Sequence, residues 1–181
     1  MEKSMEYPLK WITKSLAVGY APRSENHLQS IHSAGIRAIV NLCSECYDLH
    51  ETERNSNFEV YYLPIADEYA PEIQELEKLI EWMSQQIKSG NPILVHCRYG
   101  IGRTGTIVLA FLMYSGHDFK TARKMMRSTP SWPSNRLQKE TVDSYIMKLR
   151  GITINEKFSD NASNSANKFF ERLKSALKWK D

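Results

Sequence analysis

A cysteine and an arginine stand in the middle of the chain at a spacing that suits phosphate chemistry. Cys97 and Arg103 are separated by five residues, two of them glycine, within the segment His-Cys-Arg-Tyr-Gly-Ile-Gly-Arg-Thr-Gly (96–105). An apolar run, Ile93–Val95, precedes this segment, and a stretch with helical character, Thr106–Tyr114, follows it. A buried strand, a glycine-containing turn and a helix start bring backbone N–H groups and the positive end of a helix dipole around one point. The pattern predicts an anion-binding loop.

The residue types in this loop predict attack of a thiolate on phosphorus. The positive field at the helix start stabilises the thiolate of Cys97, and the planar guanidinium of Arg103 suits two phosphate oxygens. His96 and Thr104 add polar groups beside the site. We expect the loop to hold the phosphate through the residues Arg98, Tyr99, Gly100, Ile101, Gly102 and Arg103. The alternative of a buried core cysteine leaves the glycines and the arginine unexplained. A nucleotide-binding P-loop is excluded, because arginine follows Gly102 where that motif has lysine.

At these residues the chain resembles the cysteine-dependent protein tyrosine phosphatase superfamily, whose active-site loop is His-Cys-x5-Arg-Ser/Thr. It is most similar to the small dual-specificity branch, over roughly 11–149, with Leu16–Gly19 resembling that branch's opening strand. The resemblance implies that Asp67, about thirty residues before the cysteine in a Pro-x-x-Asp pattern, is the general acid. It also implies that Gln138, in the late helix, positions the attacking water.

The segment around Asp67 has features of its own that suit a mobile acid. It is a proline-bounded loop, Leu63–Pro71, between an expected strand and an expected helix, so rigid elements flank a segment that can move over a pocket. The alternative role for an acidic residue here is to cap the helix that begins at Pro71, and Glu68 and Glu72 fit that role better. Asp67 must be protonated when the thiolate attacks and must act as a base when water attacks.

Alternating strand and helix patterns predict the fold. We expect strands at 16–18, 36–42, 60–63 and 93–95, and helices at 25–34, 71–89, 103–114, 118–128 and 135–149. Ser24 precedes the first helix as an N-cap and Gly35 follows it. Such alternation predicts an α/β fold, dual-specificity-phosphatase-like, with a mostly parallel central sheet flanked by helices and a site at the carboxyl ends of the strands.

Composition fits one enzyme domain with an appendage. The chain has 181 residues, of which 41% are hydrophobic and 25% are charged, and its net charge is +3. We expect a catalytic domain over 1–150, a polar linker over 151–166 and an amphipathic helix over 167–181. Packing of that helix on the catalytic domain is favoured over membrane contact. Three cysteines are too few for a disulfide framework, and no long apolar span or signal-peptide pattern is visible, so we expect a cytoplasmic protein.

The remaining two cysteines, Cys43 and Cys46, form a Cys-Ser-Glu-Cys segment. Zinc binding is not supported, because only His50 stands nearby as a further ligand, and we expect no metal. The favoured interpretation places Cys43 in the core and Cys46 in a loop. Resemblance to phosphoinositide-directed relatives offers a sharper alternative, in which Cys43 traps the nucleophile as a disulfide and protects it from over-oxidation.

These residues predict a protein phosphatase that hydrolyses phosphotyrosine, and also phosphoserine and phosphothreonine, through a phosphocysteine intermediate without any cofactor. Its partners would be phosphorylated proteins or peptides, and no nucleic acid is expected. The alternatives are a phosphoinositide or RNA 5′-phosphatase of the same fold, or a phosphate-binding module without turnover. The basic residues Arg123, Lys124 and Arg127 are interpreted as a solvated helix face. The sequence does not predict the oligomeric state.

Overall fold

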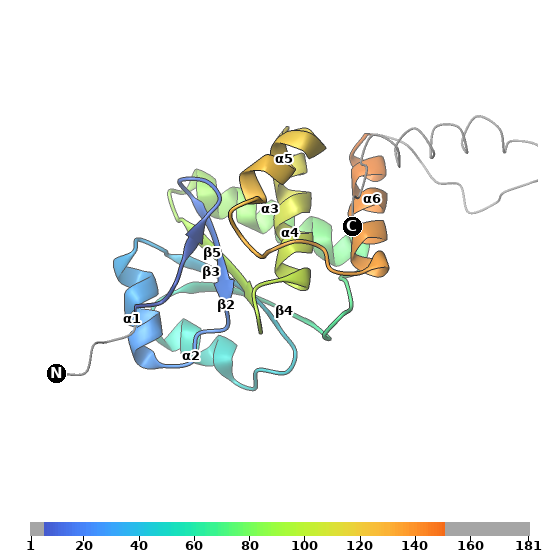
Figure 1. Ribbon diagram of the computed structural model, residues 1–181. Coiled ribbons are helices and arrows are strands. Elements are labelled where there is room, and N and C mark those ends of the chain that lie inside the picture. The colour runs from blue at the N-terminus through green and yellow to red at the C-terminus, as the bar shows by residue number, and fades with distance from the viewer. Residues whose placement is uncertain (1–5, 151–181) are drawn as a thin grey trace, which may run out of the picture.

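The computed structural model describes residues 6–150, which form a central sheet with helices on both faces (Figure 1). The sheet has five strands in the order β1-β2-β5-β3-β4. They are β1 (Lys10–Trp11), β2 (Leu16–Tyr20), β3 (Ala38–Cys43), β4 (Glu59–Ile65) and β5 (Ile93–Cys97). The pairs β2–β5, β5–β3 and β3–β4 are parallel, and β1 pairs antiparallel with β2 at one edge. The expected α/β fold with a mostly parallel sheet is confirmed.

Six helices cover the two faces of the sheet. They are α1 (Glu25–Ser33), α2 (Leu49–Asn55), α3 (Ile73–Lys88), α4 (Gly102–Tyr114), α5 (Phe119–Met126) and α6 (Arg136–Leu149). Figure 1 shows α1 and α2 on one side of the sheet and the other four on the opposite side. No helix within residues 6–150 is long and apolar enough to cross a membrane.

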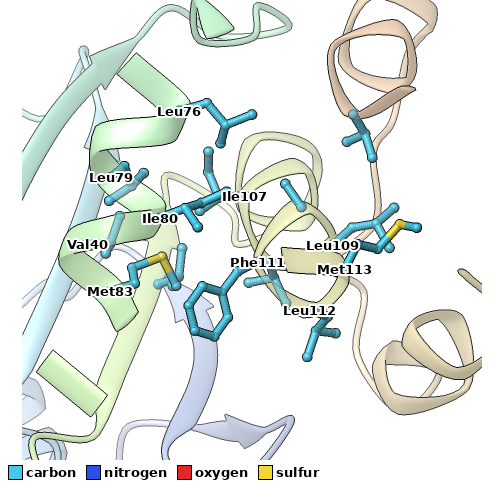
Figure 2. Close-up of a cluster of buried hydrophobic side chains, with 14 of the residues drawn as sticks. Val40, Leu76, Leu79, Ile80, Met83, Ile107, Leu109, Phe111, Leu112 and Met113 are labelled. Atoms are coloured by element: carbon cyan, nitrogen blue, oxygen red, sulfur yellow. The ribbon is translucent and has the colours of Figure 1, made fainter. Parts of the chain in front are cut away.

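The larger core lies between the sheet and the helices α3 and α4 (Figure 2). The helix α3 presents one apolar stripe to it, with Leu76, Leu79, Ile80 and Met83 buried at helical spacing. By contrast α4 is buried from Arg103 to Met113, because β5, α3, α5 and α6 surround it. Burial on all sides holds the first turn of α4 in a fixed position relative to the end of β5.

Helix caps follow the sequence signals closely. The side chain of Ser24 accepts a hydrogen bond from the backbone N–H of His27, and Gly35 has a φ of +93° just after the end of α1. Glu72 is the N-cap of α3, and its backbone N–H donates to the carboxylate of Glu75 at 3.3 Å. The capping role expected for Glu72 is therefore confirmed.

Two elements were not expected from the sequence. The strand β1 has only two residues, too few for a pattern, and α2 carries the polar sequence Leu-His-Glu-Thr-Glu-Arg-Asn without an apolar stripe. The expected strand at 36–42 begins two residues later, at Ala38, and the expected helix at 118–128 covers only Phe119–Met126. The linker over 151–166 and the helix over 167–181 lie outside the described residues, so both stay predictions.

Candidate active site

The 96–105 loop joins the carboxyl end of β5 to the start of α4. Cys97 is the last residue of β5, which lies between β2 and β3, and α4 begins at Gly102. Two glycines allow other segments to approach closely. Gly100 has a φ of +71°, and an added Cβ there would lie 2.3 Å from the carbonyl oxygen of Gly19. A Cβ on Gly105 would lie 2.3 Å from the backbone nitrogen of Trp132. The loop could not close in this way with larger residues.

A small cavity of about 220 Å³ lies over this loop. Its lining comes from the loop itself, from the segment after β4 and from the start of α6: Asp67, Glu68, Cys97, Tyr99, Ile101, Gly102, Arg103, Ser134 and Gln138. The structure thus brings together Cys97, Arg103, Asp67 and Gln138, which the sequence analysis had assigned to one site. They come from three segments of the chain far apart in sequence.

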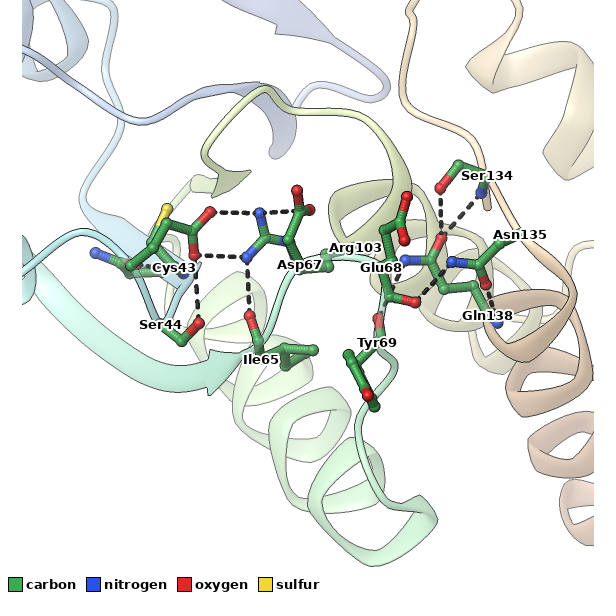
Figure 3. A network of polar contacts seen from close by, with 12 residues as sticks. Cys43, Ser44, Ile65, Asp67, Glu68, Tyr69, Arg103, Ser134, Asn135 and Gln138 are labelled. Carbon is green, nitrogen blue, oxygen red and sulfur yellow. Dashed lines mark hydrogen bonds and ion pairs between the residues drawn. The ribbon is translucent and has the colours of Figure 1, made fainter.

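Arg103 is 2% exposed and all its terminal N–H groups are engaged (Figure 3). The Nη1 atom donates to Glu45 Oε2 and to the carbonyl oxygen of Ile65, both at 2.8 Å. The Nη2 atom donates to Glu45 Oε1 at 2.7 Å and lies 3.0 Å from Asp67 Oδ1. The edge formed by Nε and Nη2 is the one that a phosphate can approach once Asp67 yields its contact.

Glu45 is the main site residue that the sequence analysis missed. The hydrogen bonds from Arg103 are the largest cause of a lowered pKa of the Glu45 carboxyl, about 2; burial opposes them, and a backbone hydrogen bond and the charge of Arg103 add smaller contributions. Burial lowers the pKa of Arg103, but the hydrogen bonds to Glu45 and the neighbouring negative charges raise it above its usual value overall. The pair therefore stays ionised and fixes the guanidinium plane. The sole sequence signal was an acidic residue two positions beyond the buried end of β3.

The loop Leu63–Pro71, which carries Asp67 and is called here the acid loop, is hydrogen-bonded to α6. Asn135 Nδ2 donates to the carbonyl oxygen of Glu68 at 2.6 Å, and Gln138 Nε2 donates to that of Tyr69 at 3.1 Å (Figure 3). Glu68 has a φ of +65°, which turns the chain sharply after Asp67. The side chain of Asp67 is 64% exposed, so it reaches Arg103 from the solvent side of the cavity. These bonds hold the loop closed over the site.

His96 and Thr104 are not among the residues that line the cavity. His96 is fully buried, and its Nε2 atom lies 2.8 Å from Glu53 Oε1 on α2. Asn41 Nδ2 donates to the other oxygen of Glu53 at 2.9 Å. The hydroxyl of Thr104 is buried without a hydrogen-bond partner among the described residues. His96 thus connects the loop to α2 through Glu53. The helix α2 was not expected from the sequence, because its buried residue is charged.

The remaining loop residues separate into two groups. Tyr99, Ile101 and Gly102 line the active cavity, as expected for the phosphate loop. The exposed side chain of Arg98 points elsewhere: it lines a neighbouring cavity of about 640 Å³, with its guanidinium 5.4 Å from the ring centroid of Tyr99. Gly100 contributes backbone geometry and is buried. A phosphate contact of Arg98 would therefore come from its backbone N–H.

The three cysteines are all free thiols. Cys43 is fully buried at the end of β3 and Cys46 is partly exposed, as the favoured interpretation expected. Burial first, and then a hydrogen bond with Cys46, raise the pKa of the Cys43 thiol. Within residues 6–150 no group of three His, Cys, Asp or Glu side chains is placed to hold a metal ion. The disulfide between Cys43 and Cys97 stays a prediction.

Comparison with known proteins identifies the family. The family model described as "Swiss Army Knife protein, DSP-PTPase phosphatase domain" matches residues 7–157. The chain belongs to this dual-specificity phosphatase family. Among curated relatives, human dual specificity protein phosphatase 2 is 36% identical over 92 residues, which are 49% of this chain and 27% of that protein. The phosphatidylinositol 3,4,5-trisphosphate 3-phosphatase cnrN of Dictyostelium discoideum is 24% identical over 160 residues, 77% of this chain and 24% of that protein.

Solved structures of the family share the fold. The active form of Tk-PTP superposes with a TM-score of 0.70 at 28% identity, covering 82% of this chain and 99% of that one. PTPMT1 in complex with PI(5)P superposes with a TM-score of 0.68 at 18% identity, covering 79% of this chain and 97% of that one. The chain spans only about a quarter of the length of the two curated relatives above.

Proposed function

We propose that this chain is a cysteine-dependent protein phosphatase that hydrolyses phosphotyrosine, and also phosphoserine and phosphothreonine. The observation that carries the proposal is the convergence of Cys97, Arg103 and Asp67 on one cavity. Membership of the dual-specificity phosphatase family supports it. A module that only bound phosphate would need neither a nucleophile nor an acid at this place.

The geometry supports a two-step reaction. The thiolate of Cys97 attacks phosphorus, the bond from phosphorus to the substrate oxygen breaks, and that oxygen takes a proton from Asp67. Water then attacks the phosphocysteine while Asp67 takes its proton, which releases inorganic phosphate and restores the thiolate. Gln138 lines the cavity, where its amide would orient this water. A bound phosphate competes with Asp67 for the Nη2–H of Arg103 and so frees the acid to turn toward the leaving oxygen.

The walls of the cavity favour a protein substrate. Tyr99 and Ile101 line it and are 54% and 43% exposed, and Tyr69, next to the acid loop, is 62% exposed. This open aromatic and aliphatic rim suits a phosphorylated side chain and its neighbouring residues.

A phosphoinositide is the second candidate substrate, because the relative cnrN is named as a phosphatidylinositol 3,4,5-trisphosphate 3-phosphatase. Such a substrate carries further phosphates, and among residues 6–150 the one basic side chain that lines the cavity is Arg103, which is already paired with Glu45. Ile101 stands where a second basic side chain would contact those phosphates. An RNA 5′-phosphate has the same shortage of basic contacts.

The first test is turnover of a small aryl phosphate in the presence of a chelator, with Cys97→Ser as the paired variant. We expect release of phosphate by the native chain and none detectable from Cys97→Ser, which should still bind vanadate. A Cys97→Ser protein that kept a tenth of the activity would contradict the cysteine mechanism. A panel of phosphopeptides, phosphoinositides and 5′-triphosphate RNA then decides the substrate class.

A further inference from the structure

The exposed face of α5 carries four basic side chains in one row. They stand at i, i+3, i+4 and i+7, the spacing that places residues on one helix face. These residues, called here the basic stripe, are Lys120, Arg123, Lys124 and Arg127. All four are exposed, while Phe119, Ala122 and Met126 on the opposite face are buried. Core packing therefore explains the apolar face of α5 and leaves the basic stripe unexplained.

Neighbouring carboxylates balance the charge of the basic stripe only in part, since Asp118 interacts electrostatically with Lys120. Within residues 6–150 none of the four side chains forms an ion pair, and Arg123 instead lies 5.8 Å from the ring centroid of Trp132. The one acidic residue that borders the same groove is Asp118, whose carboxylate accepts the backbone N–H of Thr121 at 2.7 Å. The surface thus keeps a net positive charge, which attracts an anionic partner.

A groove of about 880 Å³ runs between the basic stripe and the segment Thr129–Trp132, which leads toward α6. Thr121, Thr129 and Ser131 border it as well, but the hydroxyls of Thr129 and Ser131 already donate to the backbone carbonyls of Met126 and Gly100. No large hydrophobic side chain that is exposed within residues 6–150 lies in the groove, and the ring of Trp132 is covered by Arg123 and met edge-on by Phe119. Membrane insertion and base stacking both need exposed apolar or aromatic groups. The side-chain carboxylates of an acidic peptide match the cations of this groove better.

The groove adjoins the active site through the segment that borders it. Ser131 Oγ donates to the carbonyl oxygen of Gly100 in the phosphate loop at 2.6 Å, and the backbone of Trp132 packs against Gly105. Ser134, a few residues further on, lines the active cavity. A protein whose phosphorylated residue occupies that cavity can therefore lay a flanking segment along α5.

We propose that the basic stripe and its groove dock an acidic segment of the phosphoprotein substrate, beside the catalytic cavity. This inference rests on the proposed protein phosphatase activity. Residues 151–181 of the chain itself are a poor match for the groove, because they contain six basic and four acidic residues. The docking contacts would lower KM for substrates with acidic flanks and leave the chemical step unchanged.

The test compares two phosphotyrosine peptides, one with an oligoglutamate flank and one with an oligoglutamine flank. The stripe variant is Lys120→Gln with Lys124→Gln and Arg127→Gln; Arg123 is kept because it covers Trp132. The matched control, Lys14→Gln with Lys78→Gln and Lys88→Gln, removes the same charge from other exposed positions. We expect the glutamate flank to lower KM about tenfold for the native chain and the control, and not for the stripe variant. Activity toward a small aryl phosphate should be equal in all three proteins.

Binding of the unphosphorylated oligoglutamate peptide, followed by fluorescence anisotropy, separates this proposal from the catalytic one. If no peptide is hydrolysed but oligoglutamate binds through the stripe, the phosphatase proposal fails and the acidic-segment site stands without a substrate role. The docking proposal would be overturned if the ratio of KM for the two peptides were the same in the stripe variant and the native chain. It would also be overturned if the stripe and control variants lost the preference for the glutamate flank equally. Stripe-dependent binding of phosphatidylserine vesicles or single-stranded RNA, without a preference for glutamate, would assign the surface to a membrane or to RNA instead.

Discussion

In the proposed mechanism each residue of the site has its own chemical task, and the contacts of Arg103 are consistent with that division. Glu45 contacts one edge of the Arg103 guanidinium, and the edge formed by Nε and Nη2 would bind the phosphate. Asp67 touches the same Nη2 atom but remains 64% exposed, so it can exchange its contact when a phosphate binds. The buried arginine is fixed by Glu45 and the carbonyl of Ile65, while the acid stays movable.

Replacing Arg103 by lysine should strongly reduce the stabilisation of the transition state. Arg103→Lys keeps the charge but loses the two-pronged contact with phosphate and the bidentate pair with Glu45. The loss of transition-state stabilisation, calculated from kcat/KM, should be about 3–4 kcal/mol, the range for an oxyanion donor. Steady-state kinetics on an aryl phosphate measures the loss, and circular dichroism checks the fold. A value of kcat/KM near that of the native chain would place the phosphate contact elsewhere.

The role of Asp67 predicts a dependence on the leaving group. With Asp67→Asn, kcat on a substrate with a poor leaving group should fall by about 10²–10⁴, the usual contribution of general acid catalysis. The loss should shrink for a leaving group that departs without a proton. Glu68→Gln is the matched control, because Glu68 lines the same cavity. Equal losses on both substrates, or a larger loss for Glu68→Gln, would move the acid role away from Asp67.

Among the secondary-structure elements, the start of α6 holds the acid loop closed. The side chain of Asn135 makes two hydrogen bonds. Its Oδ1 accepts from the backbone N–H of Gln138, which caps α6, and its Nδ2 donates to the carbonyl oxygen of Glu68. Gln138, one turn later, donates to the next carbonyl, that of Tyr69. The orientation of Asp67 thus depends on a helix that lies about seventy residues away in the chain.

Two substitutions of Asn135 separate the cap from the loop contact. Asn135→Asp and Asn135→Ser keep a side-chain oxygen that can cap α6. The ionised Asp side chain has no donor for the carbonyl of Glu68, and the shorter Ser hydroxyl cannot reach it while it caps the helix. We expect both variants to keep the native melting temperature within a few degrees and to lose kcat about tenfold on a poor leaving group. On an activated leaving group the loss should be smaller. A loss that is the same for both leaving groups would show that Asn135 supports the fold and not the acid loop.

At the scale of the whole molecule, Arg103 ties together segments that belong to different parts of the sheet. Its bonds join the start of α4 to the segment after β3 and to the end of β4, and its contact with Asp67 adds the acid loop. Arg103 therefore also connects these segments structurally, and the ionisation of its carboxylate partners should affect the free energy of unfolding.

Acid should destabilise the native chain through Glu45 at pH values below its ordinary pKa. The folded pKa of Glu45 is about 2 instead of 4.5, so the unfolded chain binds this proton more readily. The stabilisation is complete above pH 4.5 and disappears as the pH falls toward 2. At about 1.4 kcal/mol per pKa unit its upper bound is about 3.5 kcal/mol, and solvent screening of this partly exposed pair makes it smaller.

Urea unfolding of the native chain and Glu45→Gln between these pH values measures this effect. The difference in unfolding free energy between the two proteins should narrow as the pH falls. Glu140→Gln is the control, because it removes a carboxylate from the exposed pair with Arg136. A difference that stayed constant with pH would show that Glu45 does not carry the acid sensitivity.

The sequence by itself determined the features that depend on neighbouring residues. The spacing of Cys97 and Arg103, the glycines between them and the apolar strand before them specify the phosphate loop locally. Apolar periodicity likewise predicted α3 and the main strands, and the family resemblance together with a proline-bounded loop indicated Asp67. These signals suffice because turn geometry, helix caps and amphipathic faces are encoded within a few residues of the chain.

The tertiary structure alone decided which charges meet. Glu45 pairs with an arginine 58 positions away, Glu53 is fully buried because His96 and Asn41 face it, and Asn135 reaches the acid loop across 67 positions. A charged residue has the same local sequence signature whether water or a distant partner satisfies it. For the same reason the polar helix α2 has no apolar periodicity that would predict it. The basic stripe of α5 indicates a docking surface only in the tertiary structure, where a groove and the phosphate loop lie beside it.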